Sequence, residues 1–206
     1  KMFAQMSGRP ALMERFGGPD NRDIGCWAVT EPDHGSDSLA VTEPHFTDPR
    51  LRANCVTRRD GDTFIINGQK AAWVSNGTIA TVATLFCTID PSHGFSGGGV
   101  CLVPLDSPGV SRGKALDKLG QRALNQGEIF FDEVRIPADL MVVGAAEYAF
   151  VVEAVLAMAN AAMGAIFVGL GRAALEHALG YAKERVQGGV PIVQHQSVKE
   201  IGRAHV

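Results

Sequence analysis

Hydrophobic and polar positions change their pattern along this chain. From residue 24 to residue 131, short apolar runs alternate with turns rich in Gly, Pro, Asn and Asp, which predicts β-strands. Asp60-Gly61 predicts a hairpin, because Asp-Gly adopts the positive φ values that suit the twist of paired strands. The predicted strands cover residues 24–29, 54–58, 63–67, 81–90, 99–104, 110–113 and 128–131. Regular turns between short strands favour an antiparallel β-sandwich or barrel over alternating strands and helices.

Helix-forming segments flank these strands. Residues 1–16 predict a helix that ends at Gly17-Gly18-Pro19. Residues 148–185 contain no Pro and are rich in Ala, Leu, Met and Val, which predicts one long helix or two nearly continuous ones. A further helix is predicted to begin at residue 195, after a Gly-Gly-Val-Pro break.

The fold class predicted from these patterns is α+β. A middle β domain at residues 23–143 is predicted between helical segments at residues 1–22 and 144–206. Residues 149–170 are almost long enough for a membrane span. However, Glu153, Asn160 and the many small residues favour close packing in a soluble helical bundle, so we predict no membrane span.

Composition and charge exclude some classes of function. The net charge is −3 and the basic residues are scattered, which gives no electrostatic reason to expect a nucleic-acid partner. The four cysteines show no Cys-x-x-Cys spacing and lie in strand-like runs. They are predicted to be buried, reduced thiols of an intracellular protein, and no metal site is expected.

The polar loop TEPDHGSD, which begins at Thr30, is the first candidate for chemistry. Pro32 restricts one φ and Gly35 permits an unusual one, so the backbone N–H groups between them are predicted to face an anionic ligand. The alternative is an ordinary Gly/Pro turn. Glu31 and Asp37 are predicted to hold the shape of the loop, because a carboxylate would repel an anion. Residues 38–52 form a polar, Pro-containing loop whose role the sequence does not indicate.

The second candidate is Trp73, followed closely by Ser75 and Asn76 at the end of a predicted strand. An indole there can stack on a flat ring while the Ser75 hydroxyl donates to a ring heteroatom. The alternative is that the tryptophan fills the core.

Four motifs, taken in order, carry a family resemblance: TEPDHGSD from Thr30, WVSNG from Trp73, Leu119-Gly120, and FDEVRIP from Phe131. From about residue 24 to the last residue, the chain resembles the acyl-CoA dehydrogenase family of flavoproteins. Members are roughly twice this length, so the resemblance implies that an N-terminal helical domain and the end of a C-terminal helical domain are missing. A helix-like pattern also continues up to each end of the sequence.

The resemblance implies FAD as cofactor and assigns contacts to it. Trp27, Val29 and Thr30 would hold the pyrimidine edge of the flavin, and Gly35 and Ser36 would meet the pyrophosphate. Ser36 would also lie beside the pantetheine arm of the substrate. The remaining implied contacts are Trp73 and Ser75 against the flavin, and Arg185, Gln187, His195 and Gln196 on the cofactor of a neighbouring subunit. Gln187-Gly188 departs from the family's more usual Thr-Phe.

The implied reaction is α,β-dehydrogenation of an acyl-CoA thioester to trans-2-enoyl-CoA, with hydride transfer to flavin N5. The catalytic base is expected to be a Glu beyond Val206. Ala159-Asn160 stands where a minority of members carry a Glu-Arg pair.

Further implications concern partners. Electron-transfer flavoprotein is expected as electron acceptor, a homo-oligomer such as a homotetramer as assembly, and fatty acid metabolism as context. The expected location is the cytoplasm, or the mitochondrial matrix in a eukaryote. Two alternatives stay open: a flavin monooxygenase or oxidase of the same fold, and a flavin-free structural subunit, as Asn160 and Gln187-Gly188 would allow.

Overall fold

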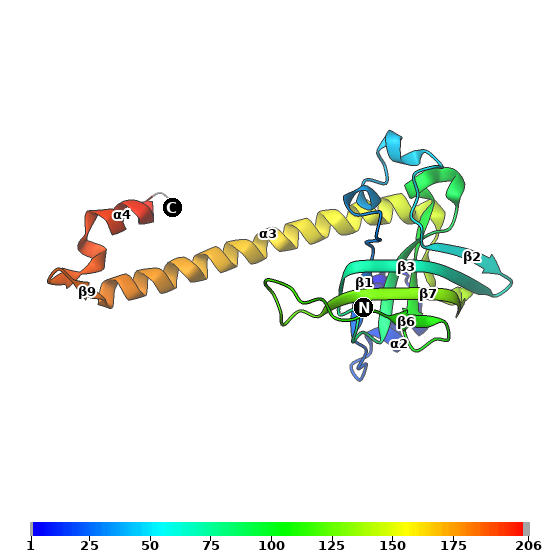
Figure 1. Cartoon of the computed structure of the whole chain (residues 1–206), viewed down its shortest axis with the longest axis horizontal. Helices are drawn as coiled ribbons and strands as arrows, with labels where there is room; N and C mark the ends of the chain where they lie inside the picture. Colours follow the sequence, from blue (N-terminus) through cyan, green and yellow to red (C-terminus); the bar gives the residue numbers. More distant parts are fainter. Residues whose placement is uncertain (1, 204–206) are drawn as a thin grey trace. The chain divides into compact units, whose positions relative to one another are not determined.

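The computed structural model describes residues 2–203, without the side chains of Ala72 and residues 201–203. The chain divides into two compact units, residues 1–154 and residues 155–206. The long helix α3 (Ala145–Glu184) contributes to both (Figure 1). The boundaries proposed from the sequence at residues 22 and 143 stay predictions.

The first unit is built on a mixed β-sheet. The strand order is β6-β7-β3-β2-β4-β5-β8, and β1 pairs with β4. The pairings β1–β4 and β2–β4 are parallel, and the others in this sheet are antiparallel. The strands are β1 (Gly25–Ala28), β2 (Val56–Asp60), β3 (Thr63–Ser75), β4 (Val82–Thr88), β5 (Gly98–Pro104), β6 (Val110–Arg112), β7 (Gln126–Pro137) and β8 (Met141–Val143). The predicted α+β class is confirmed.

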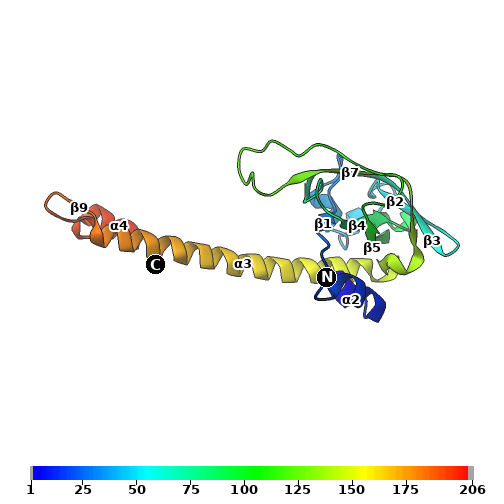
Figure 2. The same ribbon diagram turned by 90° about the horizontal axis from the view of Figure 1, so that it is seen from below.

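The longest strands differ most from the prediction. β3 and β7 pair along nearly their whole length and lie side by side in both ribbon views (Figures 1 and 2). The predicted segments 63–67 and 128–131 are only parts of them. The register between β3 and β7 shifts at two places, between Ile66 and Gly68 and between Lys70 and Val74. These shifts let β3 continue past residues that interrupt the alternation of apolar and polar positions.

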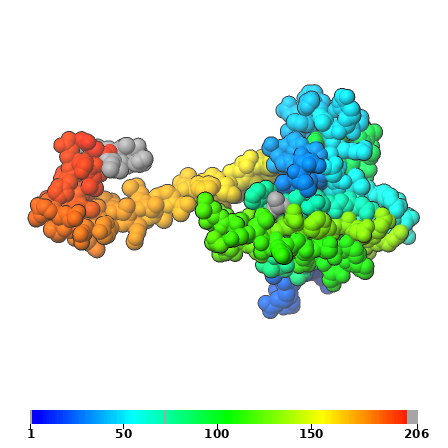
Figure 3. All heavy atoms as spheres, in the orientation of Figure 1, coloured from blue at the N-terminus to red at the C-terminus, as the bar shows by residue number. Residues whose placement is uncertain are grey.

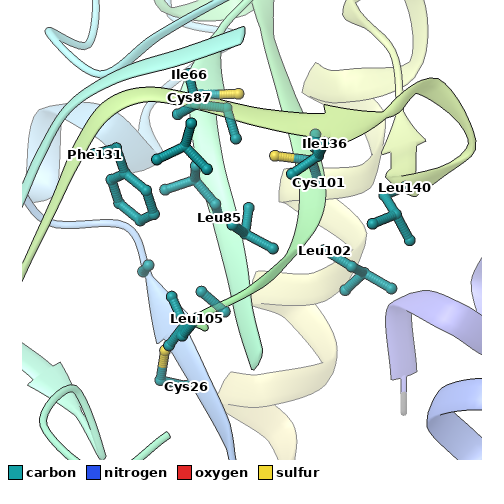
Figure 4. Close-up of a cluster of buried hydrophobic side chains, with 14 of the residues drawn as sticks. Cys26, Ile66, Leu85, Cys87, Cys101, Leu102, Leu105, Phe131, Ile136 and Leu140 are labelled. Atoms are coloured by element: carbon teal, nitrogen blue, oxygen red, sulfur yellow. The ribbon is translucent and has the colours of Figure 1, made fainter. Parts of the chain in front are cut away.

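The core of this unit lies against the sheet. Leu85, Cys87 and Cys101 are almost completely buried and gather with Phe131 and Ile136 in Figure 4. All four cysteines are buried and free, as predicted. Burial raises the pKa values of the Cys26 and Cys55 thiols to about 12, so these thiols stay protonated at neutral pH.

The N-terminal segment forms two short helices and not the single helix predicted over residues 1–16. They are α1 (Met2–Met6) and α2 (Pro10–Gly17). Gly8 has a φ of 64° and Pro10 begins α2, so both residues prevent a continuous helix. The end of α2 at Gly17-Gly18 agrees with the prediction.

The predicted loop at residues 38–52 contains two 3₁₀ turns, η1 (Ser36–Leu39) and η2 (Pro44–Thr47). The segment 36–47 runs along the surface of the first unit, in the blue to light-blue part of Figure 3, with Ser38 and Val41 buried beneath it. The Thr42 hydroxyl donates to the Glu153 carboxylate at 2.6 Å, which ties this loop to the start of α3. Two further 3₁₀ segments, η3 (Pro91–Gly97) and η4 (Ala138–Leu140), connect strands.

In the second unit, α3 is followed by the hairpin β9 (Val186–Gln187) and β10 (Val190–Pro191), the turn η5 (Ile192–Gln194), and α4 (Gln196–Arg203). Gly188 and Gly189 both have positive φ, as a two-residue hairpin turn requires. The predicted last helix is present, and its residues 204–206 lie outside the described part. By length and hydropathy, α3 could cross a membrane, and 17% of its most apolar window is buried.

Candidate functional site

Two sequence motifs meet where the chain after β1 runs beside β3. The backbone N–H of Ala71 donates to the Thr30 carbonyl at 2.9 Å. The Asn76 side-chain amide donates to the Gly25 carbonyl at 3.2 Å. Residues 25–30 and 71–76 are therefore antiparallel neighbours. Thr30 and Ser75 lie at opposite ends of this pair.

The two tryptophans have different surroundings within this site. The Trp27 ring stacks on Phe86 at 5.3 Å between centroids and meets Phe3 edge-on at 5.8 Å. The Trp73 side chain is 60% exposed. The Trp27 ring is 40% exposed but packs against two aromatic side chains, whereas Trp73 presents a more open aromatic surface to a planar ligand.

Both strand-end hydroxyls are accessible for hydrogen bonding. Ser75 Oγ accepts from the Gln126 side chain at 3.2 Å and keeps its own hydrogen for another acceptor. Among the described residues, no partner is recorded for Thr30 Oγ1 or for the Thr30 N–H. These groups can bind the heteroatoms at the edge of a flat ring.

The loop after Thr30 corrects one prediction. A Cβ on Gly35 would meet nothing within 4 Å, and the backbone there has a φ of −131° and a ψ of −103°, outside the helical and extended regions. The His34 N–H bonds to the Glu31 carbonyl, and the Gly35 N–H bonds to Asp37 Oδ1 at 2.7 Å, so both donors are used inside the loop. In the described structure the N–H groups of Asp33, Ser36 and Asp37 lack partners, so one of the donors predicted between Pro32 and Gly35 stays available.

Asp37 maintains the shape of this loop, as predicted. Its carboxylate accepts from the Gly35 and Ser38 N–H groups and lies 2.7 Å from His34 Nδ1. Burial alone would raise the pKa of Asp37, but these hydrogen bonds and the His34 ring outweigh it and lower the pKa below its ordinary value.

Glu31 has a structural role too, and its partner was missed from the sequence. Glu31 accepts from the backbone N–H groups of Asn54 and Cys55 and from Lys70 Nζ at 2.7 Å. Both side chains of the Glu31–Lys70 pair are 1% exposed. A single lysine within an apolar strand was the available signal, because a buried ammonium group requires a nearby acid.

In the second unit, two of the four predicted site residues, Gln187 and His195, contact each other. The Arg185 carbonyl accepts from the Ile192 N–H at 2.8 Å, which closes the β9–β10 hairpin. His195 Nε2 lies 2.9 Å from the Gln187 carbonyl. The Gln196 side chain donates to Glu200 at the start of α4. Arg185 and Gln187 are exposed, so their side chains are accessible to a ligand.

Comparison with known proteins now identifies the family. Residues 26–134 match the acyl-CoA dehydrogenase middle domain, and residues 149–201 match the acyl-CoA dehydrogenase C-terminal domain. The chain belongs to the acyl-CoA dehydrogenase family.

Named relatives agree with this assignment. The chain is 32% identical over 177 residues to the mitochondrial short-chain specific acyl-CoA dehydrogenase of Homo sapiens, covering 85% of this chain and 40% of that protein. It is 32% identical over 191 residues to cyclohex-1-ene-1-carbonyl-CoA dehydrogenase of Syntrophus aciditrophicus, covering 91% of this chain and 43% of that protein. The chain thus spans about two fifths of the length of these curated relatives.

A solved structure shows the same fold. The butyryl-CoA dehydrogenase from Megasphaera elsdenii superposes with a TM-score of 0.83 at 26% sequence identity, covering 99% of this chain and 51% of that one.

Proposed function

We propose that the protein containing this chain is an FAD-dependent acyl-CoA dehydrogenase that converts an acyl-CoA thioester into its trans-2-enoyl product. The observation that carries this proposal is the exposed Trp73 ring, with the Ser75 and Thr30 hydroxyls on the same antiparallel segment pair of the family's middle domain. When bound, the flavin would supply the hydride acceptor.

The residues of the first unit fit a flavin. Trp73 offers a flat surface for the ring system, and the Thr30 N–H and hydroxyl offer donors to its edge. Gly35 and Ser36 are exposed, and the Ser36 N–H lacks a partner among the described residues, which suits a pyrophosphate oxygen. Val29 and Trp27 would contribute through the main chain, because the Trp27 ring is already stacked on Phe86.

The remaining contacts belong to the proposed assembly. Arg185, Gln187, His195 and Gln196 would hold the cofactor of a neighbouring subunit in a homo-oligomer, with a homotetramer as our proposal. An electron-transfer flavoprotein would accept the electrons. The base would be a Glu outside residues 1–206, because α3 carries Ala159-Asn160 and Glu153 accepts a hydrogen bond from Thr42. We place the protein in the cytoplasm, or in the mitochondrial matrix of a eukaryote.

The test uses the full-length protein. Visible absorbance should show about one flavin per chain, and dehydrogenation should be measured with butyryl-CoA and cyclohex-1-ene-1-carbonyl-CoA, chosen from the names of the relatives. Ser36→Ala combined with Trp73→Ala should remove the flavin. A colourless wild-type protein would contradict the proposal and favour a flavin-free subunit, whereas full flavin content in the double variant would contradict the site assignment.

One observation favours a second candidate, an oxygen-reactive flavoenzyme of the same fold. Asn160 stands where an arginine is usual in the family, so ordinary acyl-CoA chemistry lacks one expected group. Rapid reoxidation of the reduced protein by air would support this candidate, whereas slow reoxidation would support the dehydrogenase.

A further inference from the structure

The buried pair of Lys70 and Glu31 connects three separate segments of the first unit. Lys70 Nζ donates to the Val29 carbonyl at 2.8 Å and to Glu31 Oε1 at 2.7 Å. The second Glu31 oxygen accepts from the Asn54 N–H at 2.6 Å. The pair therefore joins the chain after β1, the start of β2 and the middle of β3.

Stability alone does not explain this pair. Each side chain is 1% exposed, and transferring two charges out of water carries a desolvation penalty that their attraction often only balances. Well-packed apolar residues of the same volume are commonly as stable or more stable. A buried ion pair is better explained when its charges fix the position of a backbone group that apolar packing would not fix.

The geometry in question is that of the Val29–Thr30 peptide. Lys70 binds its carbonyl, and the Thr30 carbonyl of the next peptide is held by the Ala71 N–H. The Thr30 N–H has no partner among the described residues. A cation on the carbonyl polarises the whole peptide group, which makes the N–H of the same group a stronger donor.

We propose that Lys70, held by Glu31, is a positioning residue that fixes the Val29–Thr30 peptide and strengthens the Thr30 N–H as a donor to the flavin. This inference rests on the proposed function, because it assumes that a flavin lies against Thr30. A strengthened donor at the ring edge favours the reduced flavin, whose ring system carries more negative charge. Lys70 therefore makes the cofactor easier to reduce.

The experiment compares variants of the full-length protein. Lys70→Met alone leaves the Glu31 carboxylate buried without its cation and is expected to fold poorly. Glu31→Gln combined with Lys70→Met removes both charges and keeps similar volumes. The flavin dissociation constant should rise at least tenfold. The reduced flavin should lose about tenfold more affinity than the oxidised flavin. The two-electron midpoint potential of the bound flavin should therefore fall by about 30 mV.

A matched control removes a charge pair elsewhere. Arg135 and Asp60 form an exposed ion pair at 2.8 Å next to the β2–β3 turn, and Asp60→Asn with Arg135→Met should leave the flavin dissociation constant and potential unchanged. A double variant of Lys70 and Glu31 that folds and keeps both wild-type values would overturn the positioning role while leaving the proposed function intact. A wild-type protein that binds no flavin would overturn the proposed function, and this inference with it.

Discussion

At the residue scale, the two tryptophans show how one residue type serves two purposes. Trp27 contacts two aromatic rings, Phe86 and Phe3, whereas Trp73 is mostly exposed. The sequence offered core filling as the alternative for Trp73, and its exposure excludes that alternative. Contacts with other rings, which the sequence does not show directly, separate an aromatic residue that stabilises the fold from one available to a ligand.

We predict effects of different size on stability for the two alanine variants. Trp27→Ala should lower the free energy of unfolding by about 2 kcal/mol, because aromatic pairs contribute about 0.5–1.5 kcal/mol each beyond area burial. Trp73→Ala should change it by less than about 0.5 kcal/mol, as exposed substitutions usually do. Urea denaturation of the flavin-free protein measures both values without a contribution from bound ligand. Equal losses in the two variants would contradict the different packing of the two rings.

A second prediction at the residue scale concerns Asp37 and the pH dependence of stability. Because the folded state lowers its pKa below the ordinary 3.8, the ionised carboxylate stabilises the folded state above that value. This stabilisation is lost as the pH falls through the folded pKa. Asp37→Asn should therefore cost about 1 kcal/mol near neutral pH and progressively less below pH 3.8. Denaturation curves of both proteins over this range test it, and a difference that does not shrink on acidification would contradict it.

At the element scale, β3 depends on a glycine that the local pattern does not explain. Gly68 has a φ of 139°, and a Cβ there would lie 2.6 Å from the Cys55 Cα. The strand can pass Cys55 only because position 68 has no side chain. This contact joins residues 13 positions apart in the sequence, so strand periodicity alone gives no sign of it.

Gly68→Ala is predicted to destabilise the protein by about 3 kcal/mol, from backbone strain together with the clash against Cys55. The matched control is Gly25→Ala in β1, for which a Cβ meets nothing within 4 Å and φ is not positive. Its free energy of unfolding should change by less than about 1 kcal/mol. Thermal or urea unfolding distinguishes the two, and equal stability of both variants would contradict the described path of β3.

At the scale of the whole molecule, α3 carries apolar side chains that are exposed in the described chain. Ile166, Phe167, Val168 and Leu170 are each more than 60% exposed in the described chain. Exposing four apolar side chains within five residues of one helix to water is unfavourable, so further protein or lipid must cover them. The match of residues 149–201 to the family's C-terminal domain favours protein.

We therefore predict that the full-length protein is a homo-oligomer that stays in solution without detergent. Sedimentation should give a mass several times that of one chain. Phe167→Asp should lower this mass or the yield of folded protein, because it places a charge in the covered surface. The control His177→Asp changes an exposed polar position on the same helix and should keep the wild-type mass. A monomeric wild-type protein would contradict the prediction, and a need for detergent would favour the membrane alternative.

Local pattern alone determined the α+β class, the Asp-Gly hairpin, the long helix and the burial of the four cysteines. These features depend on periodicity and turn chemistry, which act over a few residues. The motifs at Thr30 and Trp73 were also found in the sequence, although their roles came from a family resemblance.

Tertiary structure decided the rest. The buried ion pair of Glu31 with Lys70, the passage of Gly68 beside Cys55, and the alignment of Thr30 with Ala71 all join residues distant in the sequence. The tertiary structure also shows that the Gly35 N–H, which the sequence analysis assigned to a ligand, donates to Asp37 within the loop. Local patterns report which face of a strand is buried, whereas the partner of a buried charge is determined by how the strands are ordered in the sheet.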